Sequence, residues 1–205
     1  MKLFGTPGSP FVRKVRIVLE EKRVPCEFIV ERGSAPGSRV PHFNPLGKIP
    51  TLVLDDGRGL YDSPVIVEYL DAQGTGPRLI PEARDDRIEV KRWEALGDGV
   101  AEATVAVNHE YREPEEKQRA PAWFERQRLK IDRGLAVMEE GLGAGQFCFG
   151  DRFTLADIAA GYALGYLDFA LPEIEWREGH PALARLAERL AARKSFSGTV
   201  HAKAA

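Results

Sequence analysis

The turn Thr6-Pro7-Gly8-Ser9 carries a hydroxyl group at Ser9, immediately before a proline that starts an expected helix. A serine at this position commonly caps the helix, because its oxygen accepts a hydrogen bond from a free backbone N–H. That bond leaves the hydroxyl proton available for donation to a thiolate. The helix start also offers unpaired N–H groups and the positive end of the helix dipole. Ser9 is therefore either an ordinary cap or a thiolate donor, and Thr6 is the alternative hydroxyl.

The segment Asn44-Pro45-Leu46-Gly47-Lys48-Ile49-Pro50 leads into an expected strand. A proline at the entry of a strand is often only a boundary marker. If the bond before Pro50 is cis, however, the chain turns sharply and Ile49 presents its backbone N–H and C=O to solvent. A short peptide can pair with those groups as an added strand. Lys48 is then either a partner for a peptide carboxylate or an ordinary solvated lysine.

A second helix start, Asp62-Ser63-Pro64, combines an acid with a hydroxyl group. The ordinary interpretation makes Ser63 the N-cap. The functional interpretation uses the helix N-terminus and the serine hydroxyl for an α-carboxylate, and Asp62 for an α-ammonium group. An amino-acid head group has both charges on one carbon. The pair therefore favours a zwitterion over a phosphate, which Asp62 would repel.

The elements that must position these residues alternate in the first third of the chain. Apolar residues recur at helical spacing after Pro10, and most charged side chains of that helix are expected on the opposite face. The pattern predicts strand–helix–strand, with parallel strands, and then a hairpin and a helix, which is the thioredoxin-like arrangement. The expected strands are Lys2 to Gly5, Glu27 to Glu31, Thr51 to Leu54 and Gly59 to Tyr61, with a loop over 33–47 and a helix from Ser63.

The rest of the chain is expected to be an all-α helical bundle. Trp93, Leu96, Val100, Ala103 and Val107 recur every three or four residues, as a bundle seam requires. A second long stripe runs from Phe124 to Leu142, and Thr154 with Asp157 predicts a capping box before a buried, central helix. A last amphipathic helix follows Pro181. The expected domains are a thioredoxin-like domain over 1–76, a linker over 77–84 and the helical domain over 85–205.

Composition excludes several classes of protein. The 205 residues are 43% hydrophobic and 29% charged, and the formal net charge is -2, so no global field attracts nucleic acid or an anionic membrane. The apolar stretch from Leu155 to Leu171 is interrupted by acids and is too short to span a bilayer, and the opening ten residues do not form a secretory signal. Cys26 and Cys148 lie far apart and the histidines are dispersed, so we expect a cytoplasmic protein without a metal site.

The sequences SPFVRKVRIVLEE, FNPLGKIPTLV, DSPVIVEYL and FTLADIAA together resemble the cytosolic glutathione S-transferase family, and most of all its bacterial YibF-like branch. The resemblance covers essentially the whole chain. It implies a homodimer that conjugates glutathione, as co-substrate, to a small hydrophobic electrophile. By position in the family pattern, Ser9 would contact the glutathione sulfur beside Phe11, Lys48 and Ile49 would hold the cysteinyl-glycine part before a cis Pro50, and Asp62 and Ser63 would hold the γ-glutamyl head. Asp98 is either a contact to that head group across the dimer or a structural acid.

Departures from other branches of that family narrow the expected chemistry. The first tyrosine is Tyr61, and the turn before the first helix has no cysteine, so tyrosine-type and mixed-disulfide mechanisms lack their residue. Glutathione-dependent peroxide or disulfide reduction shares the expected site and stays an alternative, as does a non-catalytic glutathione-binding scaffold. Asn108, His109, Tyr111 and Arg112 either line the electrophile pocket or form an exposed helix end.

Overall fold

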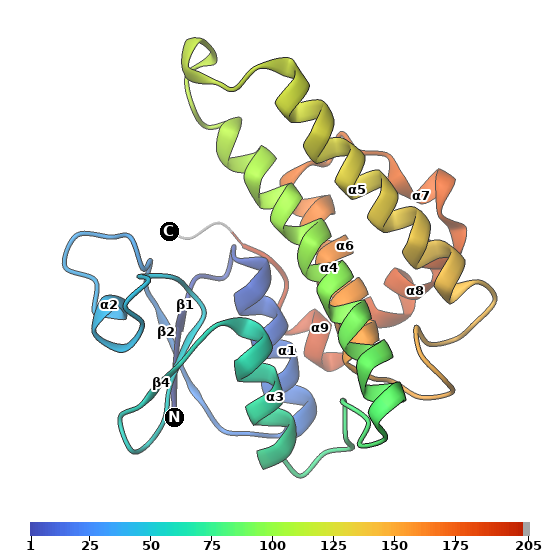
Figure 1. The fold of residues 1–205 in the computed structure, drawn as a ribbon. Helices are drawn as coiled ribbons and strands as arrows, with labels where there is room; N and C mark the ends of the chain where they lie inside the picture. Colours follow the sequence, from blue (N-terminus) through green and yellow to red (C-terminus); the bar gives the residue numbers. More distant parts are fainter. Residues whose placement is uncertain (203–205) are drawn as a thin grey trace. The chain divides into compact units, whose positions relative to one another are not determined.

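A computed structural model describes residues 1–202 of the chain. The chain forms two compact units: Met1–Ile80 together with the segment from Ala191 onward, and Pro81–Leu190. Figure 1 shows the strands at the N-terminal end and the long helices in the second half of the chain. The domain boundaries expected from the sequence, at 76, 84 and 85, stay a prediction.

The first unit is built on a four-stranded sheet in the order β2-β1-β3-β4. The strands are β1 (Lys2–Gly5), β2 (Glu27–Val30), β3 (Thr51–Val53) and β4 (Gly59–Leu60). β1 and β2 are parallel, whereas β3 is antiparallel to both β1 and β4. All four expected strands are confirmed to within one residue at their ends, and so is the parallel pairing.

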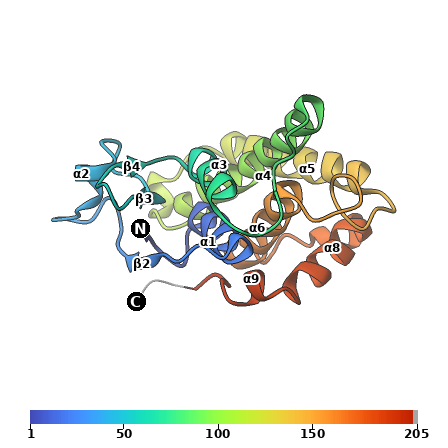
Figure 2. The ribbon, with the colours of Figure 1, turned by 90° about the horizontal axis from the view of Figure 1, so that it is seen from below.

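Helices cover both faces of this sheet. α1 (Pro10–Lys22) and α3 (Ser63–Gln73) pack against each other and lie on one face, as Figure 1 and Figure 2 show. On the other face, the short helix α2 (Val40–Phe43) packs on Phe4 and Val53. The expectation of an unbroken loop over 33–47 is wrong at α2, because burial of Val40 and Phe43 on the sheet stabilises a single turn that no long periodic pattern announces.

A short C-terminal helix belongs to the first unit. This helix, α9 (Lys194–Ser197), packs on α1, and the Arg13 guanidinium lies 5.7 Å from the ring centre of Phe196. Arg193 and Ser195 bond the carboxylate of Glu21, with the Ser195 hydroxyl at 2.5 Å. Arg13 is consequently buried, although most charged side chains of this helix were expected on the face opposite the apolar one. No sequence pattern predicted a second element covering that face of α1.

The second unit consists of helices arranged around one buried helix. Its elements are α4 (Arg84–Glu110), η1 (Glu115–Lys117), α5 (Pro121–Leu142), α6 (Leu155–Ala170), α7 (Trp176–Gly179) and α8 (Pro181–Ala191), the last of which ends at the unit boundary. The expected capping box of α6 is confirmed: Thr154 accepts from Ala156 N at 3.3 Å, and Asp157 accepts from Thr154 N at 2.8 Å. α6 is buried along nearly its whole length, as predicted.

Glycines allow the helices of the second unit to approach closely. A methyl group at Gly97 of α4 would lie 2.7 Å from the carbonyl oxygen of Ala159 in α6. A methyl group at Gly134 of α5 would lie 2.4 Å from a methyl carbon of Val100 in α4. Both separations are shorter than van der Waals contact, so a side chain at either position would push two helices apart. Over residues 1–202, no helix combines the length and the apolar character needed to cross a bilayer.

Candidate active site

Three loops of the first unit meet at one end of the sheet. Phe4 near the end of β1 pairs with Thr51, the first residue of β3, and Leu52 pairs with Leu60, the last residue of β4. The residues that follow β1, precede β3 and follow β4 therefore share one sheet edge. These residues include Ser9, Lys48, Ile49, Pro50, Asp62 and Ser63. The register thus brings together three segments that are spread over residues 9–63 of the sequence.

Ser9 caps α1. Its backbone is extended (φ -84°, ψ 128°), and its Oγ accepts a hydrogen bond from Val12 N at 3.4 Å. Ser9 N donates to Thr6 O at 3.1 Å, which closes the turn before the helix. Among the described residues, no protein acceptor takes the Ser9 hydroxyl proton. The half-buried hydroxyl group at this helix end can therefore donate to a bound anion, and Phe11 lies half-buried in the first turn of the same helix.

The segment before β3 is held in place by the buried side chain of Asn44. Its Nδ2 atom donates to Lys48 O at 2.9 Å and to Thr51 Oγ1 at 3.2 Å, while its Oδ1 accepts from Leu46 N at 3.0 Å. Thr51 Oγ1 donates to the same Lys48 carbonyl at 2.8 Å. The network fixes the backbone of the loop on both sides of Gly47, whose φ of 61° suits a glycine.

The Ile49–Pro50 peptide bond is cis, as expected. Pro50 is buried, whereas Ile49 is half-buried and Lys48 is exposed. Within residues 1–202, neither the N–H nor the C=O of Ile49 forms a hydrogen bond. These groups flank the start of a strand, so they offer one donor and one acceptor to an extended peptide.

The start of α3 differs from the expectation in one respect. Asp62 occupies the cap position, with no hydrogen bond from its side chain to the helix, and Ser63 is the first helical residue. The alternative that Ser63 is the N-cap is therefore excluded, whereas the expected start of the helix at Ser63 is confirmed. The Tyr61–Asp62 peptide bond is cis. Asp62 is exposed, and Ser63 is 3% exposed. The N-terminus of α3 remains uncapped by Asp62, as an anion site requires.

Asp98 lies in the second unit, on α4. Its carboxylate accepts a hydrogen bond from the hydroxyl group of Tyr162 on the buried helix α6. Burial, and then the nearby Asp98, raise the pKa of Tyr162 well above its usual range, so the tyrosine stays a donor. Asp98 thus has a structural contact between two helices. Its contact with a head group across a dimer stays a prediction.

The residues expected to line an electrophile pocket gather at the end of α4. Asn108 Nδ2 donates to the Tyr166 hydroxyl oxygen at 3.2 Å, and His109 and Arg112 are exposed. Burial, and then the charge of Arg112, lower the pKa of His109 below its ordinary value. Only Tyr111 of this group lines a cleft of about 510 Å³ in the second unit. Among the described residues, no cluster of three or more His, Cys, Asp or Glu side chains has the geometry to hold a metal ion.

Comparison with known sequences decides the family of this chain. A family profile described as "Glutathione S-transferase, N-terminal domain" matches residues 3–78, and one described as "Glutathione S-transferase, C-terminal domain" matches residues 121–189. The "Uncharacterized GST-like protein YibF" of Escherichia coli (strain K12) is 39% identical over 204 residues, which span 100% of both chains. The chain belongs to the glutathione S-transferase family. Its thioredoxin-like unit and helical unit are accordingly the two parts of the glutathione S-transferase fold.

Solved structures of other glutathione S-transferases agree with this assignment. A crystal structure of a glutathione S-transferase from Methylobacillus flagellatus KT "with gsh bound" superposes with a TM-score of 0.94 at 43% identity, covering 98% of this chain and 99% of that one. Another, from Methylobacterium radiotolerans JCM 2831 in "complex with glutathione sulfonate", has a TM-score of 0.92 at 43% identity, covering 100% and 96%. Both of those family members hold glutathione or its sulfonate.

Sequence reasoning missed the hydrogen bonds by which Asn44 and Thr51 hold this loop. Neither side chain reaches solvent: Asn44 is 1% exposed and Thr51 is fully buried. Their contribution is to shape the loop that carries Lys48 and Ile49. An asparagine directly before a proline is a turn signal, which would have pointed to a side chain that bonds its own loop.

Proposed function

We propose that this glutathione S-transferase binds glutathione along the sheet edge and activates its thiol for attack on a hydrophobic electrophile. The observation that carries the proposal is the meeting of Ser9, Ile49 and Asp62 at the ends of three adjacent strands. Adjacent strands lie about 4.8 Å apart, so β1 and β4 are separated by about 10 Å. An extended tripeptide is also about 10 Å long. One tripeptide can therefore reach from Ser9 to the start of α3.

The middle of the tripeptide would pair with Ile49. The backbone N–H and C=O of Ile49 form no hydrogen bond among residues 1–202. Asn44 holds this backbone in place through its hydrogen bond to the Lys48 carbonyl. Such pairing depends on peptide groups only, so it recognises an extended peptide whatever its side chains are. Lys48 is exposed and adds a positive charge for the terminal glycine carboxylate.

The γ-glutamyl head would bind at the start of α3. Its carboxylate would meet the helix N-terminus and the hydroxyl group of Ser63, and its ammonium group would meet Asp62. Asp98 of a second copy is the further proposed partner of the ammonium group. This contact requires a homodimer, which we propose as the assembly, and it would have to coexist with the hydrogen bond from Tyr162.

The thiol would lie at the start of α1, where Ser9 donates to the thiolate and Phe11 packs beside it. Lowering a thiol pKa by about 2 corresponds to about 2.7 kcal/mol of preferential stabilisation of the thiolate. A hydrogen bond to a charged group contributes about 1.5–3 kcal/mol, and a helix end about 0.3–1 kcal/mol. The two together are sufficient. Burial raises the pKa of both Cys26 and Cys148, so the protein's own thiols are poor nucleophiles by comparison.

The proposed reaction forms one S–C bond. The thiol proton leaves to solvent as the thiolate forms, and the sulfur lone pair attacks an electrophilic carbon. With an aryl or alkyl halide, the halide departs with the electron pair of the broken bond; with a conjugated carbonyl, a proton from water completes the addition at carbon. Ser9 donates to sulfur throughout and is neither nucleophile nor base. We place this activity in the cytoplasm, where the two cysteines, unpaired in the structure, would stay reduced.

Calorimetry with glutathione tests the proposal directly. Wild-type protein should release heat at a one-to-one ratio per chain, and Asp62→Asn should weaken binding about tenfold or more, since it removes a charge from the ammonium site. Glu68→Gln, an exposed acid on the same helix, is the matched control. No heat from the wild-type protein would overturn the proposal and favour a scaffold. If the protein turns over hydroperoxides or disulfides but not aryl halides, the activity at this site is reduction and not conjugation.

A further inference from the structure

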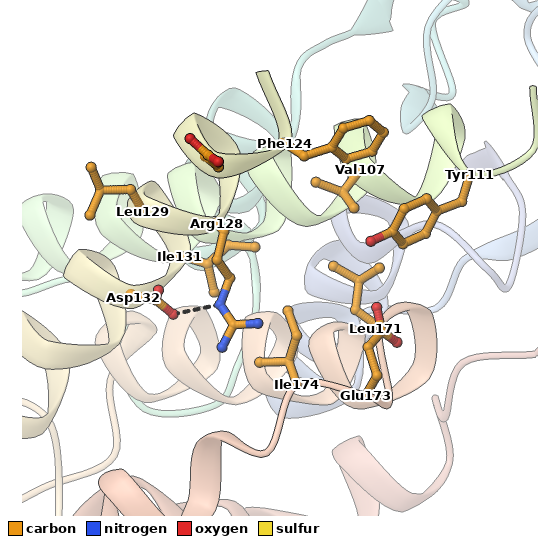
Figure 3. A pocket seen from close by; sticks show the side chains of 11 residues that line it. Val107, Tyr111, Phe124, Arg128, Leu129, Ile131, Asp132, Leu171, Glu173 and Ile174 are labelled. Atoms are coloured by element: carbon orange, nitrogen blue, oxygen red, sulfur yellow. Dashed lines mark hydrogen bonds and ion pairs between the residues drawn. The ribbon is translucent and has the colours of Figure 1, made fainter. Parts of the chain in front are cut away.

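A cleft in the second unit lies between the end of α4, the first half of α5 and the segment after α6 (Figure 3). Its volume is about 510 Å³, which is within the range of small-molecule sites. Val107, Ile131 and Leu171 are buried and form apolar walls. All the residues that line it belong to one compact unit, so the cleft is complete within that unit.

An aromatic pair borders this cleft. The rings of Tyr111 and Phe124 stack with their centres 5.5 Å apart at an interplanar angle of 18°. Tyr111 is nevertheless 54% exposed, although a large aromatic side chain gains free energy from burial. An aromatic face left open beside an apolar cleft offers a stacking surface. It also attracts cations through the negative potential of the ring.

The charges around the cleft are unequal. Arg128 Nε lies 2.8 Å from Asp132 Oδ1, and Figure 3 shows the Arg128 guanidinium between Asp132 and Ile174. The pair cancels one positive charge against one negative charge. Two acids remain, Glu125 and Glu173, and neither makes a hydrogen bond or ion pair with any described side chain. The cleft therefore carries a net negative charge at neutral pH.

We infer that this cleft is a binding site for a small amphipathic cation, namely a flat apolar body that carries an ammonium group. The apolar body packs between the Tyr111 face and the buried aliphatic walls. The ammonium group lies toward Glu173, whose side chain lies near Leu171 and Tyr111 in Figure 3. An organic anion of the same size meets the same walls but is repelled by Glu125 and Glu173. The residues of the cleft all belong to the second unit, and the inference does not depend on the proposed transferase activity.

Three probes that share one ring and differ in charge test the inference: naphthylmethylammonium, naphthylmethanol and naphthylacetate, each titrated calorimetrically into the full-length protein. The cation should bind about two- to fivefold more tightly than the alcohol, and the anion more weakly than the alcohol, as expected for partly exposed charge pairs. Glu173→Gln should reduce the preference for the cation and leave the affinity for the alcohol unchanged. Arg128→Gln should strengthen binding of the cation, because it releases Asp132.

Two further variants locate the site and control for charge. Tyr111→Ala should weaken all three probes, since it removes the stacking surface. Glu140→Gln, an exposed acid on α5 that does not line the cleft, should change none of them. Equal affinity for cation and anion, binding unaffected by Tyr111→Ala, or no binding of any probe would overturn the inference. A glutathione titration on the same preparation tests the proposed function separately. The cation site and the glutathione site can therefore each be refuted without the other.

Discussion

The Nδ2 atom of Asn44 donates to the carbonyl oxygen of Lys48 at 2.9 Å, and so fixes the backbone that leads into Ile49. The same amide bonds Thr51 and Leu46, so one buried side chain holds both ends of the loop. The peptide groups proposed to pair with glutathione are thus positioned by a buried residue.

Replacing Asn44 by Ala should lower both stability and affinity. The change removes three hydrogen bonds and leaves buried polar groups without partners, which costs about 1–3 kcal/mol in the free energy of unfolding. Glutathione affinity should fall about tenfold or more, because the Ile49 backbone is no longer held in position. Urea unfolding and calorimetry measure the two effects. Ser34→Ala, an exposed loop residue, is the control, and an unchanged affinity in Asn44→Ala would contradict the assigned role.

Replacing Ser9 by Ala should raise the pKa of bound glutathione by about 1–2, because the thiolate loses its hydrogen-bond donor. Activity should then fall at pH values below the new pKa and recover toward wild type above it. The loss of the cap should cost about 1 kcal/mol of stability or less, since the bond to Val12 N is long at 3.4 Å. Thiolate absorbance against pH measures the titration. If the thiol titration changes in Thr6→Ala and stays unchanged in Ser9→Ala, Thr6 and not Ser9 is the thiolate donor.

The buried ion pair between Lys22 and Asp71 should be a major source of stability in the first unit. The two groups lie 3.1 Å apart, and both side chains are at most 2% exposed. Lys22 also donates to the carbonyls of Gly76 and Pro77, each at 2.9 Å, and Asp71 accepts from Leu79 N at 2.8 Å. Asp71→Asn leaves a buried ammonium group without its counter-charge, which should cost about 3–5 kcal/mol.

Chemical unfolding of that variant measures this cost. Glu20→Gln on α1 removes an exposed partner 4.0 Å from Lys194 and should leave the unfolding free energy nearly unchanged. If Asp71→Asn is no less stable than Glu20→Gln, the pair does not hold the segment 76–80 to α1 and α3.

Glu31 should make stability depend on acid pH. Burial acts to raise the pKa of this carboxyl group, but hydrogen bonds from Arg39 and Ser38 outweigh it and hold the pKa below its ordinary value. For a carboxylate with a lowered pKa in the folded state, the stabilisation is complete above the unfolded pKa of about 4.3. It is lost as the pH falls through the folded pKa.

Glu31→Gln should therefore lower stability at neutral pH and flatten its dependence on pH below about 4.3. Urea midpoints measured across this range check the expectation. Glu27→Gln provides the control, because its exposed side chain lies 3.8 Å from Lys2 across the strand pair. Parallel acid limbs in wild type and Glu31→Gln would refute the assignment.

Patterns within single elements were sufficient for much of the fold. Three features depend on residues that are close in sequence, so the sequence predicts them directly. They are the period of apolar residues in α1, the Asp-Gly turn before β4, and the capping box of Thr154 and Asp157. The cap at Ser9 and the cis bond before Pro50 were likewise expected from neighbouring residues, and the structure has both.

Contacts between distant segments were decided by the tertiary structure alone. α2 exists because Val40 packs on Phe4 and Val53, and Arg13 is buried because α9 covers it. The apolar cleft beside Tyr111 likewise needs three segments to form. The physical reason is one of range. The hydrogen bonds of a turn or a cap join residues that are close in sequence. Burial, in contrast, depends on which surfaces the folded chain brings together.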